Sequence, residues 1–172
     1  MLEDDKVYLV PIEYDDTDMI VKWRNQSFVR NKFIFRELFT REIHEHWMKT
    51  MVDTGNVKQF IIYVKEGKQP VGTVYLRDID KKNMRAEYGI FIGEEKFIGK
   101  GIGSRSARLI IKYAFEELCL HKVMLKVFAK NEIAIESYKK AGFKTEGYFK
   151  DEVKIDGNYH DLIYMAVINS SD

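Results

Sequence analysis

The sequence predicts an α/β domain with a mixed, mostly antiparallel sheet of six to seven strands flanked by about four helices. Two observations favour this fold class. Three β-rich runs separated by short turns, residues 60–64, 71–80 and 85–92, predict consecutive antiparallel strands. A glycine loop, a helical run and a further β-rich run at 122–129 follow, and this order predicts a right-handed parallel crossover.

Composition sets the broad class. Hydrophobic residues make up 45% and charged residues 32% of the 172 residues, a balance that predicts one globular domain over residues 1–172. The net charge of +1 argues against nucleic acid or a membrane surface as partner. One cysteine, an acidic start at residues 1–6 and no apolar run of about 18 residues together predict a cytoplasmic protein.

The first half of the chain begins with a strand at 7–12 and continues with two predicted helices. Residues 15–18 offer N-caps for a helix that contains Ile20 and ends at 23–25. Residues 30–39 are rich in aromatic side chains and predict an irregular segment. Thr40 caps the second helix, which ends near Gly55. Its predicted apolar face consists of Ile43, Trp47, Met48 and Met51.

The second half of the chain supplies the helix 104–118, which is apolar on much of its circumference and should lie across the sheet. Asn131 caps a further helix that ends at Gly142. The last two strands, 145–155 and 159–168, are joined at Asp156-Gly157, a strong hairpin signal.

The loop Gly99-Lys100-Gly101-Ile102-Gly103-Ser104 joins a strand to a helix, and its glycines let a ligand approach the main chain closely. The first turn of the helix offers N–H groups to an anion, so the loop predicts a phosphate cradle. The alternative is an ordinary connecting loop. A nucleoside-triphosphate loop is excluded because Lys100 lies between the glycines, and a dinucleotide site is disfavoured because residues 127–130 contain no acid.

Residues 96–103 resemble the acyl-coenzyme A loop of the GCN5-related N-acetyltransferases (GNAT), although Lys96 replaces the usual Gln or Arg. Residues 131–143 resemble the next element of the same family, in the right order and at the usual separation. The resemblance extends from about Val7 to Ile168. It implies a single-domain GNAT fold and acetyl-CoA as co-substrate, with direct transfer to an amine and without a metal.

The same resemblance implies a set of coenzyme-binding residues. Phe91, Ile92 and Gly93 would contact the pantetheine arm and the thioester carbonyl, and Asn131 would bond near that arm. Tyr138 corresponds to the general acid beside the sulfur, although an aromatic residue at an apolar helical position is alternatively a core residue. The full implied set is Phe91, Ile92, Gly93, Phe97, Ile98, Gly99, Lys100, Gly101, Ile102, Gly103, Ser104, Asn131, Ala134 and Tyr138.

Glu87 is the candidate general base, acting directly or through water, because an acid in a central strand is costly unless it is hydrated or paired. The alternative is a salt bridge to Arg77 or Arg85. Glu87 and Tyr88 must point to opposite faces of their strand, so only one of them faces the substrate.

Several cations are candidates for the coenzyme phosphates, with solvated surface charge as the alternative: Lys100, Arg105, Arg108 and Lys130. Cys119 is expected to be a buried structural thiol rather than an acyl-enzyme nucleophile, because His121 is off its helical face. The four histidines lack metal-ligand spacing.

For the acceptor, Arg24, Asn25 and Arg30 are candidates to hold a phosphate-bearing substrate, with ion pairs to residues 15–18 as the alternative. Residues 23–25, 29–30 and 45–47 resemble the branch that acetylates nucleotide-linked amino sugars, which is the first expectation. Residues 85–87 and 155–159 also resemble polyamine and ribosomal-protein N-terminal acetyltransferases. A coenzyme A-binding module without catalysis is the non-enzyme alternative, and a homodimer is left open.

Overall fold

The strands follow one another in chain order across most of a single sheet. The computed structural model describes residues 2–170, and its eight strands are arranged β1-β2-β3-β4-β5-β6-β8-β7. The strand bounds are β1 (Leu2–Glu3), β2 (Val7–Pro11), β3 (Lys58–Val64), β4 (Gln69–Asp80), β5 (Arg85–Ile92), β6 (Lys122–Phe128), β7 (Lys144–Ile155) and β8 (Asn158–Ile168). The helix bounds are α1 (Thr17–Asn25), α2 (Ser27–Arg30), α3 (Arg41–Trp47), α4 (Ile102–Glu116) and α5 (Glu132–Lys140).

The predicted α/β class and its pairings are confirmed. β3, β4 and β5 form the expected antiparallel meander, and β5 pairs with β6 in parallel. At the β7–β8 turn, Asp156 and Gly157 both have positive φ (49° and 82°), as a two-residue hairpin turn of this twist requires. The prediction missed β1 and α2, because two residues of strand and one turn of helix are too short to show a period.

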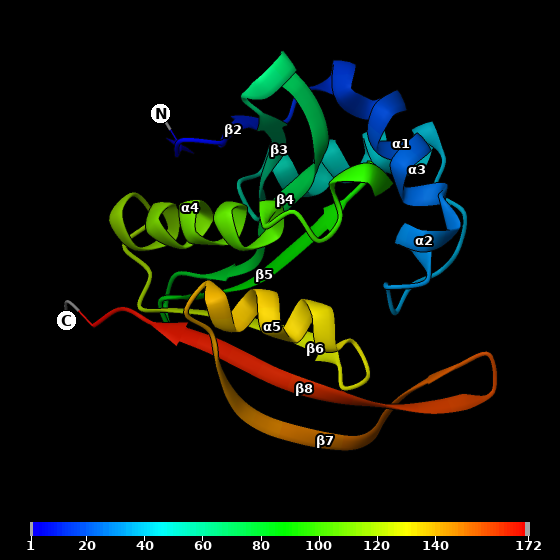
Figure 1. Ribbon diagram of the computed structural model, residues 1–172, viewed down its shortest axis with the longest axis vertical. Coiled ribbons are helices and arrows are strands. Elements are labelled where there is room, and N and C mark those ends of the chain that lie inside the picture. Colours follow the sequence, from blue (N-terminus) through cyan, green and yellow to red (C-terminus); the bar gives the residue numbers. More distant parts are fainter. Residues whose placement is uncertain (1, 171–172) are drawn as a thin grey trace.

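Helices cover both faces of the sheet. Successive residues of β3 point alternately into the hydrophobic cores on these two faces. Phe60 and Ile62 belong to the core under α4 and α5, whereas Ile61 packs with Ile20 and Trp23 of α1. Figure 1 shows α4 and α5 lying over the sheet, with α1–α3 gathered at the far end of β5. No helix within residues 2–170 combines the length and the apolarity that a membrane crossing requires.

The parallel pair β5–β6 opens after a short contact. Its ladder runs only from Arg85 opposite Lys122 to Glu87 opposite Met124, although both strands continue beyond it. The edge of β5 that faces β6 therefore has no strand partner over residues 88–92, whereas the opposite edge pairs with β4. Backbone N–H and C=O groups at such an edge can bind an extended ligand.

Two side-chain predictions in the α3 and α4 regions are wrong. Ile43 was expected on the buried face of α3 but is 45% exposed, and His44 lies inside instead, where its Nδ1 is 3.0 Å from Thr17 Oγ1. Cys119 was expected to be buried but is exposed. The chain turns sharply there, with a Cys119 φ of 52°, and Leu120 takes the buried position.

Candidate active site

A cavity of about 1040 Å³ occupies the opening between β5 and β6. This volume lies at the upper end of the range of small-molecule sites. The opening joins the two faces of the sheet, so the cavity is lined from both. α5 and the glycine loop contribute from one face, and residues 32–35, Phe39 and β4 contribute from the other.

The glycine loop has the geometry of an anion cradle. Gly99 and Gly101 have φ values of 77° and 78°, which side-chain-bearing residues rarely adopt. A Cβ at either position would meet no protein atom within 4 Å, so open space remains beside the main chain. Gly101 is the N-cap of α4, whose first N–H groups have no partner inside the helix. These residues therefore suit a phosphate or pyrophosphate.

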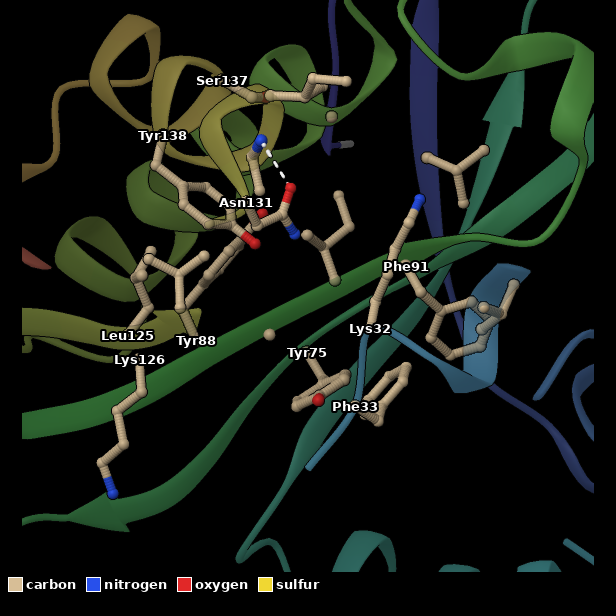
Figure 2. A pocket seen from close by; sticks show the side chains of 18 of the residues that line it. Lys32, Phe33, Tyr75, Tyr88, Phe91, Leu125, Lys126, Asn131, Ser137 and Tyr138 are labelled. Atoms are coloured by element: carbon tan, nitrogen blue, oxygen red, sulfur yellow. Dashed lines mark hydrogen bonds between the residues drawn. The ribbon is translucent and has the colours of Figure 1, made fainter. Parts of the chain in front are cut away.

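Tyr138 lies on α5 and lines the cavity, and the N-cap residue Asn131 fixes where this helix begins. Asn131 Oδ1 accepts a hydrogen bond from the Ala134 N–H at 3.3 Å, which confirms the predicted N-cap. The Tyr138 ring packs edge-on against Tyr88 and Phe143, with centroids 5.8 and 5.9 Å away. Its hydroxyl points into the cavity (Figure 2). Burial raises the pKa of Tyr138 far above its ordinary value, so the hydroxyl keeps its proton.

Most of the predicted coenzyme-binding residues line this cavity, and two do not. Those that line it are Phe91, Ile92, Phe97, Ile98, Gly99, Gly101, Ile102, Gly103, Ser104, Asn131, Ala134 and Tyr138. Gly93 lies under the Trp23 ring, which a Cβ there would meet at 2.2 Å, so it serves packing. The Lys100 ammonium lies 5.5 Å from the centre of the Phe97 ring and outside the cavity lining.

Glu87 lines the cavity on the opposite side of β5 from Tyr88. It pairs with Arg77, as the alternative prediction allowed, and also with Lys126 Nζ at 3.7 Å. Its side chain is 12% exposed. Two cations therefore hold this carboxylate at the edge of the opening.

None of the cations predicted at the phosphates lines the cavity. Arg105 Nη1 pairs with Asp4 at 2.8 Å and with Asp5, which fastens the segment after β1 to α4. Arg108 donates to the Lys140 carbonyl at 3.2 Å. Lys130 lies outside the lining as well, and Lys140, which was not predicted, belongs to it.

The three predicted acceptor residues separate in the structure. Arg24 lines the cavity, and its guanidinium lies 3.6 Å from the Phe33 ring centre and 5.3 Å from that of Phe39. Asn25 instead exchanges two 2.8 Å hydrogen bonds with the Phe39 backbone and so anchors the irregular segment. Arg30 lies outside the cavity lining. Among the residues that the structure describes, neither Arg24 nor Arg30 forms the alternative ion pairs to residues 15–18, and Asp18 pairs with Arg41.

Several lining residues were not predicted, among them Lys32, Phe33, His44, Tyr75 and Lys126. Figure 2 places Phe33 and Tyr75 across β5 from Tyr138 and Asn131. The alternation of β4 offered one signal, because Tyr75 opposes Gly89 and therefore shares the face of Glu87. Within the described residues, no cluster of three His, Cys, Asp or Glu side chains is arranged to hold a metal ion.

Comparison with known proteins agrees with this geometry. Residues 6–144 match the family model of the acetyltransferase (GNAT) domain. The chain is 32% identical to spermidine N(1)-acetyltransferase of Escherichia coli strain K12, over 94% of this chain and 85% of that protein. It is 31% identical to putative ribosomal N-acetyltransferase YdaF of Bacillus subtilis strain 168, over 77% of this chain and 70% of that protein.

A solved structure shares the fold. The crystal structure of spermidine N-acetyltransferase from Vibrio cholerae, in complex with CoA and spermine, superposes with a TM-score of 0.89 at 24% sequence identity. The superposition covers 97% of this chain and 98% of that one. The arrangement of strands and helices is thus the same over nearly the whole chain.

Proposed function

The chain belongs to the acetyltransferase (GNAT) family, and from that premise we propose how its residues transfer an acetyl group from acetyl-CoA to an amine. The observation that carries the proposal is the opening between β5 and β6, where a glycine cradle, an unpaired strand edge and a protonated tyrosine face one cavity. Each of these suits a different part of the donor.

The coenzyme is held mainly by main-chain groups. The N–H groups of residues 101–104 bind the pyrophosphate, favoured by the helix dipole of α4. The free edge of β5 at residues 88–92 bonds the amides of the pantetheine arm as a neighbouring strand would. Binding through main-chain groups does not depend on the side chain at position 96, where this chain has Lys in place of Gln or Arg.

Tyr138 is the proposed general acid. The neutral amine attacks the thioester carbonyl, the C–N bond forms and the C–S bond breaks. The departing thiolate takes the Tyr138 proton, and the proton that the acylated nitrogen loses restores the Tyr138 hydroxyl. Burial raises the pKa of Tyr138, so its hydroxyl is protonated when the thiolate develops beside it. A thiolate with an ordinary thiol pKa of about 8.5 is the weaker base, so the transfer is coupled to loss of the proton from the acylated nitrogen.

Glu87 is the proposed proton acceptor for the amine, acting through water. It is the carboxylate that lines the opening from β5, and Arg77 and Lys126 hold it there by ion pairs. An alkylamine with a pKa of about 10 arrives protonated at neutral pH, so a nearby base must remove its proton before attack.

For the acceptor, the named relatives favour a polyamine over the nucleotide-linked amino sugar that the sequence motifs suggested, since two of them are spermidine acetyltransferases. Two residues of the motifs behind that expectation have structural roles here: Trp23 packs on Gly93 and Asn25 holds Phe39. A polyamine is therefore the first acceptor to test.

One observation supports a second acceptor class. On the face of the sheet that carries Glu87, the cavity is lined by four cations and one paired carboxylate. These residues are Arg24, Lys32, Arg77, Lys126 and Glu87. A fully cationic acceptor is repelled by such a wall, whereas an amine that also bears an anionic group is attracted.

The test is a screen of acetyl transfer to polyamines, amino-sugar nucleotides, peptide N-termini and small amino acids, read by thiol release and by the mass of the acetylated product. The proposal expects amine-dependent thiol release with at least one class. If the protein binds acetyl-CoA and no amine accelerates thiol release, it is a coenzyme A-binding module and the proposed chemistry is wrong.

A further inference from the structure

Arg24 is a cation enclosed in the acceptor wall without an anion to pair with. Its Nη1 is buried and makes no hydrogen bond. The salt bridges among residues 2–170 include none to Arg24, although Asp18 on the same helix pairs with Arg41. A buried guanidinium nitrogen without a partner is costly, and because Arg24 also lines the cavity, an anionic group bound there would offset that cost.

The carboxylate on the nearby β5 strand cannot serve as that partner. Glu87 is bound by Arg77 and Lys126. The group that acts electrostatically on Arg24 is the Tyr75 phenol, which is neutral at physiological pH because burial raises its pKa. Burial also lowers the pKa of Arg24, which is the direction expected of a cation that lacks a counter-ion.

The two aromatic rings fix the guanidinium rather than neutralise it. Phe33 lies 3.6 Å and Phe39 5.3 Å from the Arg24 Cζ atom, measured to the ring centres. A ring stacked on a guanidinium covers a face of its plane and leaves the edge, where the N–H donors point, available for an in-plane partner. Planar, two-point binding at such an edge suits carboxylate and phosphate oxygens.

A second buried polar atom on the same wall lacks a partner. His44 Nε2 makes no hydrogen bond, while its Nδ1 is held by Thr17. Phe39 contacts both side chains, since its ring centre is 6.0 Å from that of His44. Arg24 and His44 both line the cavity, and each has a buried nitrogen without a partner near the Phe39 ring, so this part of the wall is a candidate polar subsite.

We infer that Arg24 forms a subsite for an anionic oxygen group, a carboxylate or a phosphate, carried by the amine acceptor. This inference rests on the proposed N-acetyltransferase function and narrows its acceptor to amines that also bear an anion. The chain would then differ in acceptor class from the spermidine acetyltransferases that it resembles.

The experiment compares matched acceptors that differ only in the anion. β-Alanine, γ-aminobutyrate and δ-aminovalerate are paired with alkylamines of the same carbon number, and O-phosphoethanolamine is paired with ethanolamine; spermidine is included. A charge-assisted hydrogen bond at a desolvated site predicts a kcat/KM that is about 10- to 100-fold higher for the anionic member of the best pair. Comparing the carboxylate and phosphate pairs identifies which anion the subsite takes.

Arg24→Met, which keeps the apolar stem between the rings, should reduce that preference to about one. Arg24→Lys, which keeps the charge and loses the planar fork, should retain only part of it. The matched control is Arg41→Ala, which removes an exposed arginine paired with Asp18 and Glu45 and should keep the full preference. Coenzyme affinity, measured by calorimetry, should be the same in all four proteins.

The inference is overturned if the wild-type protein shows no preference, or if Arg24→Met keeps it. If no amine is acetylated, the proposed function itself fails. The subsite is then decided by calorimetry of γ-aminobutyrate and butylamine with the CoA-loaded protein. Tighter binding of γ-aminobutyrate that disappears in Arg24→Met supports it, and equal binding overturns it.

Discussion

Gly101→Ala separates the role of the glycine loop in ligand binding from its role in folding. Gly101 has a φ of 78°, and a Cβ there would meet no protein atom within 4 Å. The folded protein therefore loses only the cost of a left-handed alanine, about 1–2 kcal/mol, part of which is offset by the stiffer unfolded chain. A net loss near 1 kcal/mol lowers the Tm by about 2–4 °C in a chain of this size.

The effect on the coenzyme should be larger, because the methyl group enters the space where the pyrophosphate approaches the main chain. Loss of one charge-assisted hydrogen bond raises the Kd about 10- to 100-fold. Calorimetric titration with CoA measures this directly. Gly67→Ala is the control, because Gly67 has a φ of 73°, equally open surroundings, and a place in the turn between β3 and β4. Equal CoA affinities in the two variants would refute the assignment of the loop.

Three further predictions concern titration and catalysis. Burial lowers the pKa of His44 to about 4, so as the pH falls below 6.5 the unfolded chain binds this proton before the folded protein does. Between pH 7 and pH 4 the free energy of unfolding, measured by urea denaturation, should therefore drop by up to about 3 kcal/mol more in the wild type than in His44→Gln. Parallel pH profiles of the two proteins would contradict this prediction. Glu87→Gln should lower kcat about 100-fold without changing the CoA Kd, because it removes the proposed base. If Arg77→Met lowered kcat equally, turnover would depend on the Arg77–Glu87 ion pair rather than on Glu87 as a base. Cys119→Ser should keep full turnover, since Cys119 is exposed and outside the cavity; lost activity would point to an acyl-enzyme.

Features encoded locally could be predicted from the sequence. The glycine loop, the Asn131 cap and the Asp156-Gly157 turn each depend on the backbone preferences of one or two residues, and the structure has them where they were expected. The order of β-rich and helical runs likewise determined the meander and the parallel crossover. The predicted coenzyme-binding residues came from the resemblance of residues 96–103 and 131–143 to a known family, and most of them line the cavity.

The acceptor side depends on contacts between distant segments and could not be predicted in the same way. Arg24 lines the cavity beside the rings of Phe33 and Phe39. Asn25, its neighbour in the same sequence motif, instead holds the Phe39 backbone by hydrogen bonds. The inward position of His44 depends on Thr17, which is far from it in the chain. The spacing of apolar residues predicted Ile43 at the buried position of α3, because such spacing does not detect a polar residue that is buried with a hydrogen-bond partner.

Tyr138→Phe tests the central claim most directly, because it removes only the hydroxyl proposed to protonate the departing thiolate. The ring contacts with Tyr88 and Phe143 remain, so the Tm and the CoA Kd should be unchanged. With the best acceptor from the screen, kcat should fall about 100- to 10,000-fold, the typical contribution of a positioned general acid. A variant that binds CoA normally and retains more than about a third of the wild-type kcat would contradict the account.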